Sequence, residues 1–179
     1  MRLIFDEAKA AQAAAYLLKK RGAPINLMAL VKLLYLADRA ALVETGYTIT
    51  GDRMVSMPHG PVLSQILDLI NLEPRPSQEQ SPWFKAIGPR DGYDLTLIQD
   101  PGVDALSEYE TEILDRICDL YGQLNQWQLR DLTHELPEWQ DPHGSSMPID
   151  PLDILRDAGL GDPEIRQIVE EAEQRYVGS

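Results

Sequence analysis

The stretch NLMALVKLLYLADRAALVE, residues 26–44, decides how this chain folds. As a helix it is apolar on nearly every side, so it belongs in the middle of a fold with other elements packed around it. Asn26 suits the N-cap position and Gly46 follows the end of the run, which sets the limits of the predicted helix. The sequence therefore predicts a compact helical domain built around a buried central helix.

The few polar residues of this central helix form one stripe. At 100° per residue, Lys32 and Arg39 lie within about 20° of each other, with Tyr35 beside them and Asp38 one step further round. One interpretation is a structural ion pair with a satisfied tyrosine hydroxyl, since that is how buried charge is normally tolerated. The other is direct contact with a partner. The structural interpretation is favoured, and the two are compatible.

Helical periodicity and capping residues predict further helices on both sides of the central one. Asp6 is a plausible N-cap for the first, Pro61 is placed at the first helical position of the third, and Ser107 with Glu110 forms a capping box. Asp150-Pro151 and Asp162-Pro163 each read as an N-cap followed by proline. The predicted helices cover residues 6–21, 61–70, 107–122, 125–135, 152–158 and 165–176.

Short extended segments are predicted between these helices. Residues 47–58 contain β-branched side chains around Gly51-Asp52, a turn signal, and residues 83–87 and 93–98 read as a β-hairpin. Two strands alone are marginal, so the hairpin is expected to join the earlier segment in one sheet that lies on the helices. The predicted fold class is mainly α with a small antiparallel β-sheet (α+β), as one domain over residues 1–179.

Composition and charge restrict the partners of the chain. Residues 1–60 carry eight basic and five acidic side chains, whereas residues 61–179 carry eight basic and twenty-four acidic ones. Such an acidic protein repels nucleic acid, so nucleic acid is an unlikely partner. A lone cysteine, Cys118, allows no internal disulfide, and no apolar run is long enough for a secretion signal or a membrane span. A cytoplasmic location is expected.

Signatures of catalysis are missing from the sequence. It has no phosphate-binding glycine loop, no GxSxG elbow and no HExxH helix. Its three histidines are too scattered to predict a metal site, and His134 and Glu135 point about 100° apart on a helix, which argues against an acid–base pair. The chain is therefore expected to be neither an enzyme nor a cofactor or metal protein.

Three segments in fixed order resemble the Panacea domain, the SocA-like antitoxin family that also includes phage-associated proteins. They are Lys32-Leu-Leu-Tyr-Leu-Ala-Asp-Arg39 with the following Gly51-Asp52, then Met57-Pro-His-Gly-Pro-Val62, then Leu132-Thr-His-Glu-Leu-Pro-Glu-Trp139. The resemblance spans residues 6–140, and the helices within 150–177 are less diagnostic. It implies a mainly helical antitoxin that neutralises a protein toxin, encoded beside it, by direct binding. An adaptor that delivers a partner to the ClpXP protease is the alternative, and a phage-associated enzyme or nucleic-acid-directed protein is less favoured.

The resemblance also points to particular residues, whose types suit a scaffold more than a reaction centre. Polar groups would cross-link a buried helix, glycine and proline would shape a helix entry, and Trp139 would seal the core beneath His134. Partner contact by the same residues stays open. The candidate residues are Lys32, Tyr35, Asp38, Arg39, Asp52, Gly60, Pro61, His134 and Trp139.

Overall fold

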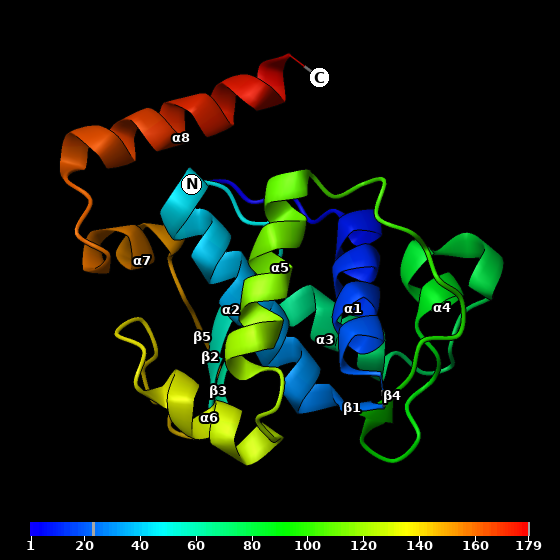
Figure 1. Ribbon diagram of the computed structural model, residues 1–179. Coiled ribbons are helices and arrows are strands. Elements are labelled where there is room, and N and C mark those ends of the chain that lie inside the picture. Colours follow the sequence, from blue (N-terminus) through cyan, green and yellow to red (C-terminus); the bar gives the residue numbers. More distant parts are fainter. Residues whose placement is uncertain (23, 179) are drawn as a thin grey trace.

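The computed structural model describes residues 1–22 and 24–178, and it is mainly helical with small antiparallel sheets (Figure 1). In chain order the elements are α1 (Glu7–Arg21), β1 (Ile25–Asn26), α2 (Leu27–Thr45), β2 (Met54–Met57), β3 (Gly60–Leu63), α3 (Ser64–Asn71), the 3-10 helix η1 (Gln78–Gln80), α4 (Pro82–Ala86), β4 (Asp94–Leu95), α5 (Glu108–Tyr121), α6 (Gln126–His134), β5 (Met147–Pro148), α7 (Pro151–Asp157) and α8 (Asp162–Val177). The predicted fold class is confirmed.

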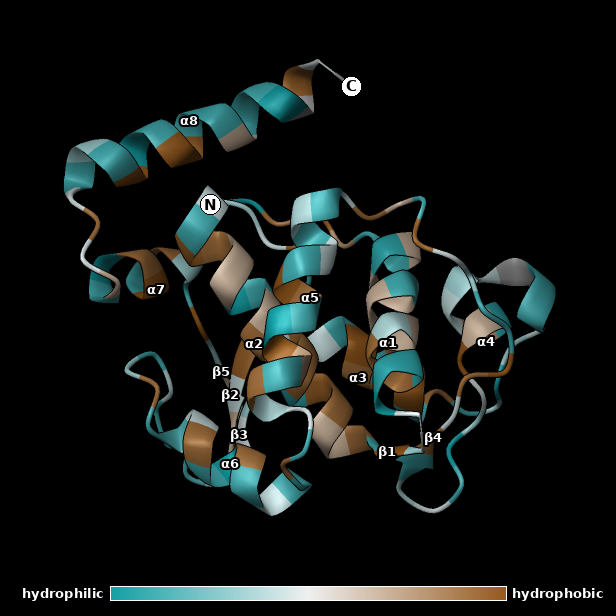
Figure 2. Ribbon diagram, in the orientation of Figure 1, coloured by the Kyte–Doolittle hydropathy of each residue, from teal (hydrophilic) through white to brown (hydrophobic). Residues whose placement is uncertain are grey.

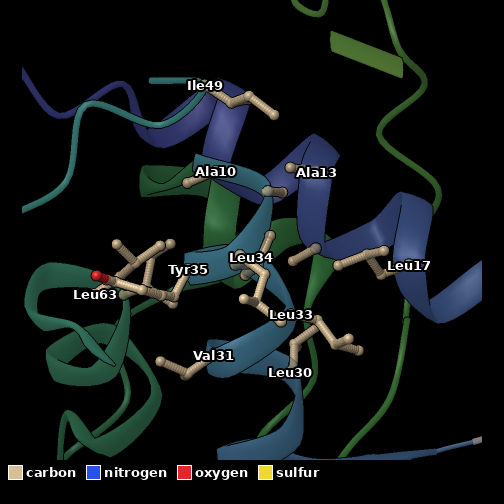
Figure 3. Close-up of a cluster of buried hydrophobic side chains, with 14 of the residues drawn as sticks. Ala10, Ala13, Leu17, Leu30, Val31, Leu33, Leu34, Tyr35, Ile49 and Leu63 are labelled. Atoms are coloured by element: carbon tan, nitrogen blue, oxygen red, sulfur yellow. The ribbon is translucent and has the colours of Figure 1, made fainter. Parts of the chain in front are cut away.

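Helix α2 is the centre of the molecule. Helices α1, α5, α6 and α7 and strand β3 all contact it, and Figure 2 shows it as largely hydrophobic along its length. Side chains from α1, such as Leu17, and from α2, such as Leu30 and Leu34, meet in a buried cluster with Ile49 and Leu63 (Figure 3). The prediction of a buried central helix is therefore confirmed.

Most of the predicted N-cap residues make capping hydrogen bonds in the structure. The Asp6 side chain accepts a hydrogen bond from the Lys9 backbone N–H at the start of α1, and the Asn26 side chain accepts two from the first turn of α2. Ser107 forms its capping box at α5, and Asp150 caps α7. These helix starts were predictable because the capping signals are local in sequence.

The third helix begins later than predicted. Residues 60–63 form strand β3, which pairs with β2 in an antiparallel hairpin that aligns Met57 with Gly60. Pro61 is therefore a strand residue and not the first residue of a helix. Strand β3 lies at the edge of the β3-β2-β5 sheet, where a residue without an N–H is tolerated. Helix α3 begins at Ser64 instead.

The hairpin predicted over residues 83–98 is present only in part, as the antiparallel bridges Ile87–Leu97 and Asp91–Asp94, whereas its first strand and the single sheet it was to join are wrong. Residues 82–86 form helix α4, because Ser81 accepts a hydrogen bond from the Phe84 N–H and Pro82 stands in the first turn. Strand β4 pairs with β1, while β2, β3 and β5 form a separate sheet. The Ser81-Pro82 pair is the same signal that correctly predicted α7.

The last helix crosses one end of the molecule and is mostly hydrophilic (Figures 1 and 2). Its N-cap is Gly161, so Asp162 is the first helical residue and not the predicted cap. Ile165 is buried, and Ile168 packs against Gly46 at the end of α2. Within residues 1–22 and 24–178, no helix combines the length and apolar character needed to cross a bilayer.

Candidate functional site

The candidate residues of α2 contact two other parts of the chain. One is the β2–β3 hairpin with the loop before it, and the other is α6 with the segment that follows it. The structure therefore brings all three motif segments of the sequence together around the central helix. Within this region the buried polar and charged side chains fall into four groups with different partners.

Tyr35 and Arg39 share one acidic partner, Glu138. The Tyr35 hydroxyl donates to Glu138 Oε1 over 2.8 Å, and Arg39 donates from Nε to Oε1 over 2.6 Å and from Nη2 to Oε2 over 3.2 Å. Burial raises the pKa of the Tyr35 phenol, and the Glu138 carboxylate raises it further. The predicted ion pair and satisfied hydroxyl are present, with an acid that lies outside the helix.

Asp38 holds the loop that follows α2. Its carboxylate accepts hydrogen bonds from the backbone N–H groups of Ile49 and Thr50, over 2.9 and 3.0 Å, and from the Thr50 hydroxyl over 2.5 Å. Burial raises the pKa of Asp38 to about 7, and these three hydrogen bonds oppose the rise. With its acceptor capacity used inside the chain, Asp38 serves the loop structure.

Asp52 caps a helix from a distance. Its carboxylate accepts hydrogen bonds from the N–H groups of Gln65 over 2.9 Å and Ile66 over 2.8 Å, at the start of α3. The residue at the N-cap position, Leu63, makes no side-chain capping bond. A carboxylate beside a helix N-terminus is favourable, so Asp52 explains why α3 begins at Ser64.

Lys32 differs from the other buried charges. Its side chain is 0% exposed, and its ammonium donates to the Pro61 carbonyl over 3.3 Å. Among the described residues no carboxylate lies within ion-pair distance of it. Burial lowers the pKa of Lys32 to about 8, with a smaller contribution from Arg130. A buried cation without an acid is a costly arrangement in a folded chain.

Gly60 makes room for the Lys32 ammonium. Its φ is 106°, and a Cβ added at this position would lie 2.6 Å from Lys32 Nζ and 2.9 Å from Thr133 Oγ1. A side chain there would displace the ammonium and strain the backbone. Gly60 therefore lies in strand β3 and not at the predicted helix entry, and it allows the close approach of a lysine of the same chain.

His134 and Trp139 lie against the turn of the β2–β3 hairpin. Their rings stack with centroids 4.0 Å apart, and the Trp139 indole N–H donates to the Met57 carbonyl over 3.0 Å. Trp139 is only partly buried, so the prediction that it seals the core is wrong. His134 Nε2 is buried without a hydrogen-bond partner among the described residues, and burial lowers the pKa of this imidazole.

A cavity of about 130 Å³ opens beside Lys32 and Gly60. Its walls are almost entirely apolar, and they come from the first two turns of α2, the β2–β3 hairpin and α3. Further lining residues are Leu27, Met28, Val31, Met57, Pro58, His59, Val62 and Leu67. The site thus combines a buried cation with an open apolar surface.

Glu138 is the site residue that the sequence analysis missed. It lies within the quoted segment 132–139, but nothing in its spacing ties it to a helix about 100 residues earlier. A signal was available, because the stripe on α2 contains two cations and one acid, and buried charges need partners. In the described part of the chain, no group of three or more histidine, cysteine or acidic side chains could hold a metal ion.

The fold and the site together define a mainly helical α+β domain whose buried central helix carries the first of the three motif segments, residues 32–39. A protein-family model described as antitoxin SocA-like, Panacea domain, matches residues 30–140. This match covers most of the chain, so the chain belongs to the SocA-like antitoxin family with a Panacea domain. Neither a search of curated proteins nor one of solved structures finds a match.

Proposed function

We propose that this chain is the antitoxin of a toxin–antitoxin pair and neutralises a protein toxin by direct binding. Membership of the SocA-like antitoxin family is the observation that carries the proposal. It follows that the partner is a protein, and that the neighbouring gene encodes a growth inhibitor. Growth arrest by the neighbouring gene product, and its relief when this chain is expressed with it, is the direct test.

The site supports a binding role without catalysis. Tyr35, Asp38 and Arg39 would be the obvious groups for acid–base chemistry, but each is engaged inside the chain by Glu138 or by the loop after α2. A reaction centre needs such groups within reach of a substrate. The chain therefore acts on the toxin by binding alone, and the toxin is inactive because the bound chain covers it.

The acidic part of the chain indicates which kind of toxin it would bind. Residues 61–179 hold twenty-four acidic side chains against eight basic ones. A toxin that acts on RNA needs a basic site, and a strongly acidic surface would speed association with it more than it would raise affinity. The association rate should fall as salt is added, and a rate indifferent to ionic strength would contradict this part of the proposal.

Inhibition and delivery to ClpXP are separated by the lifetime of the toxin. An inhibitor leaves the toxin present in a stable complex, whereas an adaptor shortens its half-life in cells that contain ClpXP. The toxin should be followed by immunoblot after synthesis is stopped, with and without this chain. An unchanged or longer half-life supports inhibition, and a shorter one would replace it with the adaptor function.

A further inference from the structure

Helix α8 is held to the rest of the molecule along one narrow face. Figure 1 shows it crossing one end of the molecule after a short connection from α7. On its apolar stripe Ile165 is buried, whereas Ile168, Val169 and Ala172 are only half-buried. Its other faces are hydrophilic (Figure 2). The helix therefore buries little apolar surface for its length, and separating it from the domain costs correspondingly little.

Helix α8 docks on Gly46 and Tyr47, at the end of α2. Ile168 lies so close to Gly46 that a Cβ added to the glycine would be 3.0 Å from the Ile168 Cγ2. The Arg175 guanidinium lies 3.8 Å from the centre of the Tyr47 ring, and the Tyr47 hydroxyl donates to Glu171 over 3.5 Å. An apolar contact and a cation–π contact on two adjacent residues thus hold the second half of the helix.

The surface that receives α8 is fixed by contacts of its own. Asp38 accepts hydrogen bonds from the backbone of Ile49 and Thr50 in the loop after α2. On the other side of the loop, the Asp6 N–H donates to the Thr50 carbonyl over 2.8 Å. None of these bonds involves α8, so Tyr47 stands on a loop that keeps its shape whether or not the helix is docked.

The connection to α7 suits a hinge. It consists of residues 158–161 and contains two glycines, Gly159 and Gly161. Gly159 has a φ of 92°, and a Cβ added there would meet no atom of residues 1–22 and 24–178 within 4 Å. Hinges are short links whose residues absorb large changes of φ and ψ, and glycine does so at the smallest cost. Rotation about this link moves α8 and leaves α7 in place.

We propose that α8 is a detachable strap: in a closed state it docks on Gly46 and Tyr47, and in an open state it leaves them as one helix by rotation about residues 158–161. Opening exposes Tyr47 and the apolar stripe of α8. The docking residues belong to the segment 30–140 that matches the family model, whereas α8 lies outside that segment. The strap therefore controls which surface of the shared domain is accessible, without changing its fold.

Hydrogen exchange of the full chain tests whether the strap opens. Helix α5, with 14 residues, is the internal reference, because it packs on both α1 and α2. A free helix of 16 residues is marginal in water, so the amides of α8 lose protection whenever the strap opens. They should exchange at least about 100-fold faster than the most protected amides of α5, and with a common opening constant.

Two matched glycines test what holds the strap closed. Gly22 and Gly46 both end a helix with a left-handed backbone and the same capping hydrogen bond. An added Cβ meets Ile168 at Gly46, but no atom of the described residues within 4 Å at Gly22. Gly46→Ala should therefore raise the open population at least about fivefold, and Gly22→Ala should leave it unchanged.

The open population is read as a second, altered distance between two spin labels. They are attached through Glu112→Cys on α5 and Gln174→Cys on α8, in a Cys118→Ser background, and double electron–electron resonance measures the distance. Both labelled positions are exposed.

A second pair of variants leaves the end of α2 unstrained. Tyr47→Ala removes the ring beneath Arg175, and Tyr93→Ala removes an exposed ring that lies 5.2 Å from the Arg90 guanidinium, away from α8. Tyr47→Ala should open the strap, and Tyr93→Ala should not.

Three outcomes would overturn the inference. They are α8 amides that exchange as slowly as those of α5, a single label distance that neither Gly46→Ala nor Tyr47→Ala alters, and equal effects of the paired variants. All of these measurements use the free chain. A neighbouring gene product that fails to bind would contradict the proposed function and leave the test of the strap unaffected.

Discussion

Two buried charges on the central helix, Asp38 and Lys32, have opposite surroundings. Asp38 faces the loop after α2 and accepts three hydrogen bonds there, so its acceptors are matched inside the chain. Lys32, less than two turns away, has a single carbonyl partner among the described residues and lies beside an apolar cavity. The contrast separates a charge that is matched within the fold from one that has no carboxylate partner among the described residues.

Removing the satisfied charge should have the largest effect. Asp38→Ala leaves the N–H groups of Ile49 and Thr50 and the Thr50 hydroxyl buried without their acceptor, so the free energy of unfolding should fall by about 3–5 kcal/mol. Denaturant unfolding measures this. Asp153→Ala, which removes an exposed pair with Arg156, is the matched control and should cost about 0.5 kcal/mol or less. Equal losses of stability in the two variants would show that the buried Asp38 carboxylate contributes no more than an exposed one.

The shared acid Glu138 should come next. Glu138→Gln removes the charge that Arg39 and Tyr35 both use, and should cost about 3 kcal/mol, because a partly buried guanidinium then lacks its counter-ion. Thermal and denaturant unfolding report the loss. In Arg39→Met the same substitution of Glu138 should cost clearly less, since the two residues act as a pair. Additive losses would show that the ion pair contributes nothing.

Removing the unsatisfied charge should reverse the sign. Lys32→Met should raise the free energy of unfolding at pH 7 by about 2 kcal/mol, because it replaces a buried uncompensated cation with an apolar side chain of similar length. Destabilisation by this variant would show that Lys32 is matched within the fold and would remove the contrast with Asp38.

The gain from Lys32→Met should depend on pH. The folded-state pKa of Lys32 is lowered to about 8, below the value of about 10.5 in an unfolded chain. Between these values the unfolded state binds more protons, so wild-type stability should rise relative to Lys32→Met as the pH increases from 8 to 10.5. Below pH 8 the difference should be constant. Unfolding curves of both proteins across this range measure it.

The smallest effect should come from a lost hydroxyl that leaves its partners in place. Tyr35→Phe removes one hydrogen bond to Glu138 but keeps the Arg39 pair and the buried ring, so it should cost about 1 kcal/mol. Chemical denaturation resolves a change of this size. A loss as large as that of Glu138→Gln would mean that the hydroxyl, and not the guanidinium, is the main partner of the acid.

Local features of the sequence predicted much of the fold. The central helix between Asn26 and Gly46, the capping box at Ser107 and the N-cap at Asp150 all depend on residues within a few positions of one another. The pairing of β1 with β4 and the capping of α3 by Asp52 join residues far apart in sequence, so periodicity could not find them.

The candidate site was predictable in part for the same reason. The polar stripe on α2 follows from helical geometry alone, and its tyrosine and arginine do find an acid. The partnership of Glu138 and the cavity beside Lys32 could not be predicted, because both depend on how the β2–β3 hairpin and the segment after α6 pack on α2. The unpartnered state of Lys32 likewise appears only when the whole fold is assembled.

Co-expression of the neighbouring toxin gene with this chain tests the central claim most directly, when growth is measured with and without the chain at equal toxin levels. We predict that the chain restores growth because it binds the toxin directly, and that the two proteins elute together when purified. A neighbouring gene product that arrests growth and is neither bound by this chain nor relieved by it would contradict the account.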